Sequence, residues 1–112
     1  MKIQNAILDE KLIRIERFDN SEIAEYFEYE YNTEGLASKY ASYSADGKIK
    51  KYTTFEYNDQ SLISVEYSFD SSDVLQNRIE YEYYASGEMK SCTKYDSNGN
   101  ILTQSTFDDK TE

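Results

Sequence analysis

The chain contains no histidine, no proline and no tryptophan, and Cys92 is its single cysteine. Without histidine it lacks the usual general base near neutral pH and the commonest metal ligand. Cys92 has no partner for an intramolecular disulfide and no histidine to activate its thiol, so we expect a half-buried strand residue in a reducing compartment. These absences predict a cytoplasmic protein that is not an enzyme and that carries no metal and no cofactor.

Basic residues and long apolar runs are also scarce. Lysine and arginine number 12 against 22 aspartates and glutamates, which gives a formal charge of -10. This excess of negative charge disfavours nucleic acids and anionic membranes as partners. No stretch approaches the roughly 18 consecutive apolar residues that a membrane-spanning helix needs, and residues 1–10 show no secretion signal. We therefore expect a soluble protein that binds neither nucleic acid nor membrane.

Aromatic residues, in contrast, are abundant. The 112 residues include 12 tyrosines and 5 phenylalanines, which is far more than a disordered acidic segment contains. A chain of this length is about the size of one domain. We expect a single folded domain over residues 1–112.

The strongest pattern is a repeat with a period of 26 residues. Three sets of similar residues follow this spacing without insertion or deletion. They are Tyr31, Tyr57 and Tyr83; Tyr43, Phe69 and Tyr95; and Ile23, Ile49, Leu75 and Ile101. Each unit contains two turn clusters, of which residues 32–35 and 44–47 are the first pair. Asn, Asp and Ser cap such turns with their side chains, and Gly supplies the positive φ of a type I turn followed by a bulge. One unit therefore predicts one β-hairpin.

The segments between the turns are rich in Tyr, Phe, Thr, Ile and Val and alternate in polarity, as half-buried strands do. The alternation predicts one aromatic face and one polar face. With residues 2–8 and 11–18 added, we expect an all-β fold, an antiparallel up-and-down meander of eight or nine strands built from 26-residue hairpin repeats. Because the aromatic face must be covered, a closed barrel or strongly curled sheet is the first choice, and a sandwich or pairing with a second copy are the alternatives.

The turn at Tyr95-Asp96-Ser97-Asn98-Gly99-Asn100-Ile101 resembles the Tyr-Asp (YD) repeat of bacterial Rhs-type proteins, in which an aromatic and Asp precede two polar residues, Gly and an aliphatic. Weaker copies occupy residues 43–49 and 69–75, and the resemblance spans roughly residues 18–108. It implies antiparallel β-hairpins in a bacterial protein associated with toxin delivery. The chain departs from the family in its period of 26 residues per hairpin and in being too short for the large shell that such repeats build.

Glutamates and tyrosines gather on the side predicted to be polar. Exposed Tyr among carboxylates is typical of a protein-binding surface, and the negative charge favours a basic partner. Tyr40 is predicted on the same side, and Glu30, Glu56 and Glu82 are predicted to line up about 10 Å apart. The candidate partner-binding residues are Tyr26, Glu28, Glu30, Tyr52, Glu56, Glu80 and Glu82.

These observations predict a non-enzymatic acidic protein-binding module. With the resemblance to Rhs-type repeats, the most economical role is an immunity or antitoxin protein that occludes the basic active site of a toxin such as a nuclease. The alternative is a small-ligand-binding β-barrel with a Tyr-lined interior. A third possibility is self-association through an uncovered aromatic face or through the sheet edges.

Overall fold

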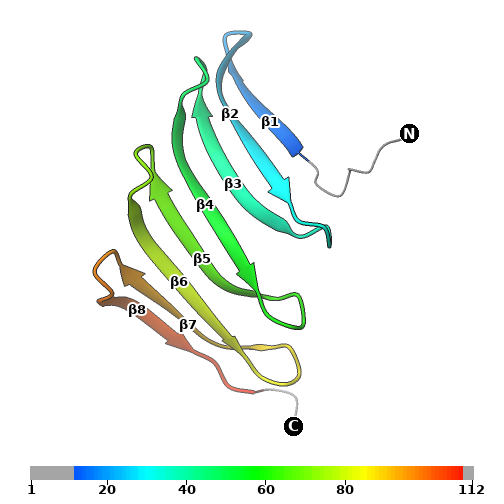
Figure 1. The fold of residues 1–112 in the computed structure, drawn as a ribbon, viewed down its shortest axis with the longest axis vertical. Coiled ribbons are helices and arrows are strands. Elements are labelled where there is room, and N and C mark those ends of the chain that lie inside the picture. Colours follow the sequence, from blue (N-terminus) through cyan, green and yellow to red (C-terminus); the bar gives the residue numbers. More distant parts are fainter. Residues whose placement is uncertain (1–11, 110–112) are drawn as a thin grey trace.

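The computed structural model describes residues 12–109, which form eight β-strands and no helix (Figure 1). The expected strand over residues 2–8 lies outside the described residues. The strands are β1 (Leu12–Asp19), β2 (Glu22–Tyr31), β3 (Ala37–Ser44), β4 (Ile49–Tyr57), β5 (Ile63–Asp70), β6 (Leu75–Tyr83), β7 (Met89–Asp96) and β8 (Ile101–Thr106).

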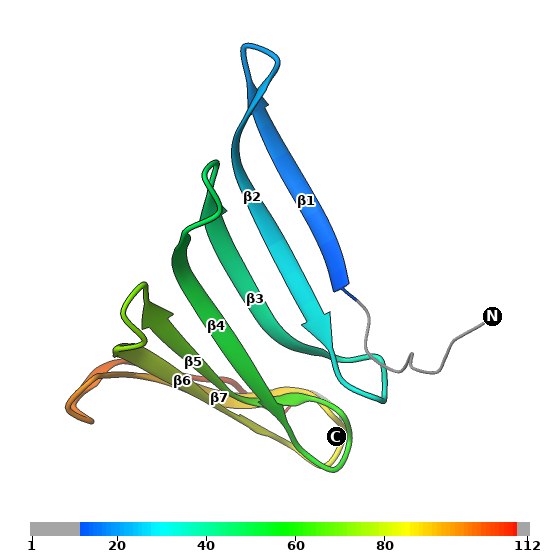
Figure 2. The same cartoon turned by 45° about the horizontal axis from the view of Figure 1, so that its top comes forward.

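All eight strands belong to one sheet, and their order in space is their order in the chain. Each strand pairs antiparallel with the next, so the predicted up-and-down meander is confirmed. Within the described residues β1 and β8 pair on one side only, which leaves the sheet open, and closure into a barrel is not confirmed. The sheet twists strongly from β1 to β8 (Figure 2), as antiparallel sheets do.

The turns form as their residues predict. Gly35 N donates to the carbonyl oxygen of Asn32 at 3.0 Å, and the Asn32 side chain accepts hydrogen bonds from the backbone N–H groups of Glu34 and Leu36. The equivalent bonds recur in the turns that begin at Asn58, Asp70 and Asp96. Gly35 has a φ of +84°, which an L side chain rarely adopts. These short loops hold consecutive strands side by side.

The expected separation into one aromatic face and one polar face is wrong. Residues opposite each other in an antiparallel pair share a face, and here Phe55 pairs with Glu66, which pairs in turn with Ile79. The aromatic side of β2, β4 and β6 therefore shares a face with the polar side of β3, β5 and β7. The cause is the register, which away from the bulges pairs odd-numbered with even-numbered residues, so Phe55 and Val65 lie on opposite faces. Each face has alternating apolar and polar strands.

A β-bulge beside each turn also moves one aliphatic residue per hairpin away from the face that alternation predicts. The register shifts where Tyr43 pairs with Ile49, and shifts in the same way at Leu75 and Ile101. These aliphatic residues consequently lie opposite Tyr43, Phe69 and Tyr95, not on the face of Phe55. Alternation within a strand does not reveal the extra residue that a bulge inserts.

The sheet has no second layer in the described part of the chain. Its radius of gyration is 17.2 Å, against about 13 Å for a compact domain of this length. The only buried residues among those described are Ala41 and Ser42 in β3 and Ser91 and Thr93 in β7. No large side chain is fully buried. Because both faces mix apolar and polar strands, neither is apolar enough to require a cover.

Candidate functional site

The seven predicted partner-binding residues all lie on one face of the sheet. Glu28 pairs with Ala41, and Ala41 pairs with Tyr52, which places β2 and β4 in common rows. Glu56 likewise connects through Val65 to Glu80. Alternate residues of a strand share a face. We call this surface the acidic face; it carries Tyr26, Glu28, Glu30, Tyr52, Glu56, Glu80 and Glu82.

Two details of the prediction for this face are wrong. Tyr40 pairs with Tyr29 and Thr53 and so belongs to the other face. Glu30 is level with Lys39 and Thr54, whereas Glu56 is level with Glu80. Equivalent residues are thus displaced by two positions in each successive hairpin, so Glu30, Glu56 and Glu82 follow a diagonal and do not form a rim. This displacement separates charges that would repel in a straight row.

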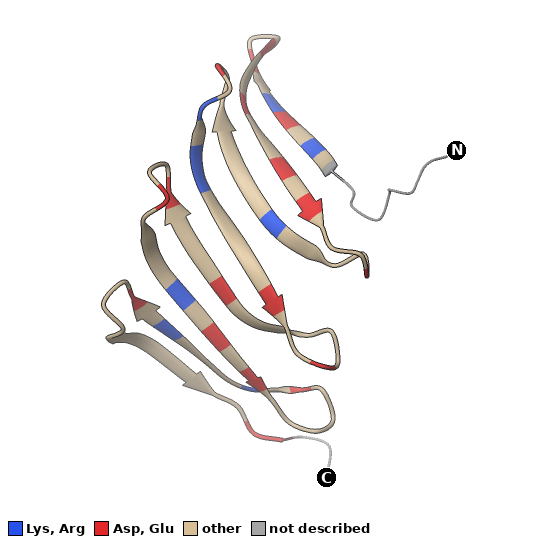
Figure 3. Ribbon diagram, in the orientation of Figure 1, with Lys and Arg blue, Asp and Glu red and all other residues tan. Residues whose placement is uncertain are grey.

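Lysine and arginine residues are interleaved with aspartates and glutamates along the strands (Figure 3). Arg78 Nε lies 2.8 Å from a carboxylate oxygen of Glu80, and Lys39 is paired with Glu30 across β2 and β3. Glu56 is exposed and makes no ion pair within the described residues. Glu82 accepts a hydrogen bond from Ser91 Oγ at 3.1 Å. The acidic face therefore carries more negative than positive charges, with Lys39 and Arg78 lying among the glutamates.

Aromatic rings on this face are held in fixed stacks. Tyr26 stacks on Tyr43 with centroids 4.9 Å apart, and Tyr52 stacks on Phe69 at 4.8 Å. The third hairpin replaces the tyrosine by Arg78, whose guanidinium lies 4.0 Å from the Tyr95 ring centroid. Such stacks fix the rings without burying them, so Tyr26 and Tyr52 offer flat, rigid contact area at little entropic cost.

The hydroxyl of Tyr52 is also held. It donates a hydrogen bond to Asp73 Oδ1 at 2.7 Å, and this bond raises the pKa of Tyr52 above its ordinary value. Lys39 Nζ lies 4.7 Å from the centroid of the same ring. Tyr52 is therefore the most firmly positioned aromatic of the predicted site.

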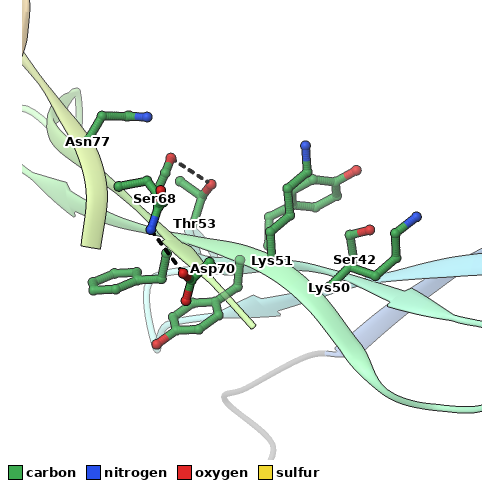
Figure 4. Close-up of a pocket in the computed structure, with 11 residues that line it drawn as sticks. Ser42, Lys50, Lys51, Thr53, Ser68, Asp70 and Asn77 are labelled. Carbon is green, nitrogen blue, oxygen red and sulfur yellow. Dashed lines mark hydrogen bonds between the residues drawn. The ribbon is translucent and has the colours of Figure 1, made fainter. Parts of the chain in front are cut away.

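A groove on the opposite face of the sheet was not predicted from the sequence. We call this face the grooved face; it bears Phe27, Tyr40, Thr53, Phe55, Ser68 and Tyr81. The groove has a volume of about 530 Å³. Its floor includes Thr53 and Ser68, whose hydroxyls are 3.3 Å apart, with Asn77 at one end and Ser42 and Lys50 at the other (Figure 4). Small polar residues at mid-strand between aromatic strands are its only sequence signal.

Lys50 is tied to a small charge cluster beside this groove. Glu25 lies 2.6 Å from Arg17 and 3.0 Å from Lys50, and these two hydrogen bonds hold the pKa of Glu25 below its ordinary value. No group of three or more potential metal ligands occurs in the described residues. The groove can offer hydroxyl, amide and ammonium groups to a polar molecule.

Tyr57 and Tyr81, on the grooved face, use their hydroxyls in hydrogen bonds within the sheet. Tyr57 Oη donates to the carbonyl oxygen of Ala37, and Tyr81 Oη donates to Glu66 at 3.0 Å. Burial is the largest cause that raises the pKa of both tyrosines, and at Tyr81 the bond to Glu66 adds to it. These hydroxyls serve the sheet and are not presented to a ligand.

No protein-family model matches the chain, and no curated protein is detectably similar to it in sequence. The described residues also include no helix long and apolar enough to cross a membrane.

Proposed function

We propose that the protein is a non-enzymatic binding module that docks a basic protein on its acidic face. The observation that supports this most is the placement of five glutamates and two stacked tyrosines on one face. Carboxylates attract a basic surface and steer its approach, while rigid aromatic rings supply dry contact area. Neither task requires a cavity, a metal or a nucleophile.

The biological role that we propose is that of a cytoplasmic immunity or antitoxin protein. The carboxylates would occupy the places where the Lys and Arg of a nuclease toxin bind phosphates, so that the toxin's active site is occluded. The step from binding module to toxin inhibitor depends on the resemblance of residues 95–101 to Rhs-type repeats.

A charge-reversal experiment tests the proposed binding surface. The full chain is immobilised and exposed to its native cell lysate at low salt, and the bound basic protein is eluted with salt, identified and assayed for nuclease activity. Changing Glu56→Lys and Glu82→Lys together should weaken binding of that protein by about tenfold or more and relieve its inhibition.

The matched control is Glu34→Lys with Asp59→Lys, which alters two exposed turn residues. Each reversal adds two charges, so both double variants change the net charge from -10 to -6. Equal loss of binding in the two double variants would mean that net charge alone, and not the acidic face, attracts the partner. Unchanged binding by the first variant would remove the acidic face from the proposal.

The alternative that we propose is a carrier of a small polar ligand. The groove around Thr53 and Ser68 favours it, because its volume of about 530 Å³ is lined by hydroxyl, amide and ammonium groups. A Tyr-lined barrel interior would require β1 and β8 to meet as well. Ligand binding in the groove should be insensitive to Glu56→Lys and Glu82→Lys, which separates this proposal from the first.

A further inference from the structure

The two edge strands carry nearly all the large exposed apolar side chains of the described residues. Ile15 is 49% exposed on β1, and Phe107, directly after β8, is 46% exposed. Only Val74, in a turn, lies away from these edges. The complete set at the edges is Ile13, Ile15, Phe18, Ile101, Leu102 and Phe107. The apolar surface of the described chain is thus concentrated where the sheet ends.

The outer edge of β8 lacks the usual protection against pairing. Natural edge strands are blunted by charged residues, by proline or by an added cover. β8 reads Ile-Leu-Thr-Gln-Ser-Thr and has neither charge nor proline. Phe107 N donates to Lys90 O on β7, so the N–H of the preceding Thr106 points toward the open edge. β8 therefore offers a row of backbone groups to another strand.

We propose that β8 of one molecule pairs with β1 of a second copy of this chain and extends the antiparallel meander head to tail. β8 is equivalent to β4 and β6, since these strands begin at Ile49, Leu75 and Ile101, at intervals of 26 residues. Inside the molecule β4 is followed by β5, and β6 by β7. β1 has the same bulge position as those following strands, because Phe18 pairs with Ile23 as Tyr43 pairs with Ile49.

The internal register fixes which residues would meet. In β6 and β7, Tyr81 pairs with Cys92 and Glu82 with Ser91. The equivalent positions in β8 and β1 place Phe107 opposite Ile15 on the grooved face. They also place Asp108 opposite Arg14 on the acidic face, as Glu30 is opposite Lys39 within the molecule. The two exposed apolar side chains would cover each other, and the two charges are complementary.

Pairing of this kind uses two different edges, so within the described residues each added copy leaves one β1 and one β8 unpaired. A heterologous contact that does not close produces an open-ended series of assemblies and not a dimer. The net charge of -10 per copy makes the copies repel one another and weakens their association. We therefore expect the size of the assemblies to increase with protein concentration.

A charge-swap experiment on the full chain tests the proposal. Weight-average mass is measured by sedimentation against concentration for the wild type, for Arg14→Asp and for Asp108→Arg. The wild type should grow beyond the dimer, and each variant alone should associate at least about tenfold more weakly, because like charges then meet. An equimolar mixture of the two variants should regain association, since every junction again joins Asp to Arg.

A second variant checks the backbone edge. Thr106→Pro removes the outward N–H and leaves the pairing of β8 with β7 intact, whereas Thr106→Val retains the N–H and serves as control. Thr106→Pro alone should abolish association, with circular dichroism unchanged in both. A wild type that stays monomeric, a mass that stops at the dimer, or a mixture that does not regain association would overturn the proposal.

Discussion

The hydroxyl of Tyr83 in β6 donates a hydrogen bond to the carbonyl oxygen of Ile63 in β5, across 2.7 Å. One period earlier, Tyr57 in β4 bonds in the same way to Ala37 in β3. In each case the hydrogen bond lies beyond the end of the backbone pairing between the two strands. For β5 and β6 the last pair at that end is Val65 with Glu80. Consecutive hairpins are therefore joined by a side chain where the backbone ladder between them has stopped.

Removing this hydroxyl should destabilise the sheet. Tyr83→Phe leaves the ring in place and takes away one hydrogen bond to a part-buried carbonyl, so the free energy of unfolding should fall by about 1 kcal/mol. Urea denaturation followed by circular dichroism measures the change. Tyr95→Phe is the control, because the Tyr95 ring packs against Arg78 and its hydroxyl makes no hydrogen bond in the described residues. Similar losses in both variants would show that the bond to Ile63 contributes nothing of its own.

Two equivalent turn positions should respond in opposite directions to substitution. Ser61 has a φ of +65°, and Gly87, one period later, has a φ of +97°. Ser61→Gly relieves a backbone conformation that L residues adopt with strain, so unfolding should cost about 1 kcal/mol more. Gly87→Ala should cost a similar amount of stability through φ alone, since an added Cβ has no atom within 4 Å. Ser71→Gly, at a position without positive φ, should not stabilise, and a gain there would point to a general effect of glycine.

Alkaline pH should unfold the protein through its tyrosines. Burial raises the pKa of Tyr57, Tyr81 and Tyr83 in the folded state above the ordinary value of 10.0. Their contribution to stability is therefore complete below about pH 10 and is lost as the pH rises through the folded-state pKa values. Tyrosinate absorbance at 295 nm follows the ionisation. In the native protein some tyrosines should ionise at higher pH than the others, whereas in urea all tyrosines should ionise over the same pH range. Glu66→Gln should bring the ionisation of Tyr81 to lower pH, and an unchanged titration would exclude Glu66 as a cause.

The turns and the meander could be predicted because their causes are local. Asn32, Asp70 and Asp96 cap their own turns, and Gly35 supplies a backbone conformation that few other residues allow. The number of residues between strands then follows directly. Which sides of two neighbouring strands share a face could not be predicted, since this depends on whether Phe55 pairs with an odd-numbered or an even-numbered residue of β5.

The common face of the candidate residues could be predicted, although the faces of neighbouring strands could not. Glu30, Glu56 and Glu82 belong to alternate strands, and because each single step here pairs odd-numbered with even-numbered residues, two steps return such residues to the same face. Tyr40 belongs to an intervening strand, where a single step decides the face, and its placement was wrong. The groove beside Thr53 depends on neighbours from three strands and has no signal within any one of them.

Every strand of the sheet pairs through its backbone only with the strands before and after it in the chain. Backbone pairing in the described residues therefore joins only consecutive strands, and chains paired in this way fold quickly because little loop entropy is lost before each pairing is formed. As in solenoid proteins, stability approximates a sum of hairpin terms and nearest-neighbour terms. The protein should fold as a zipper that can start at any hairpin, and its outermost strands should exchange their amide hydrogens first.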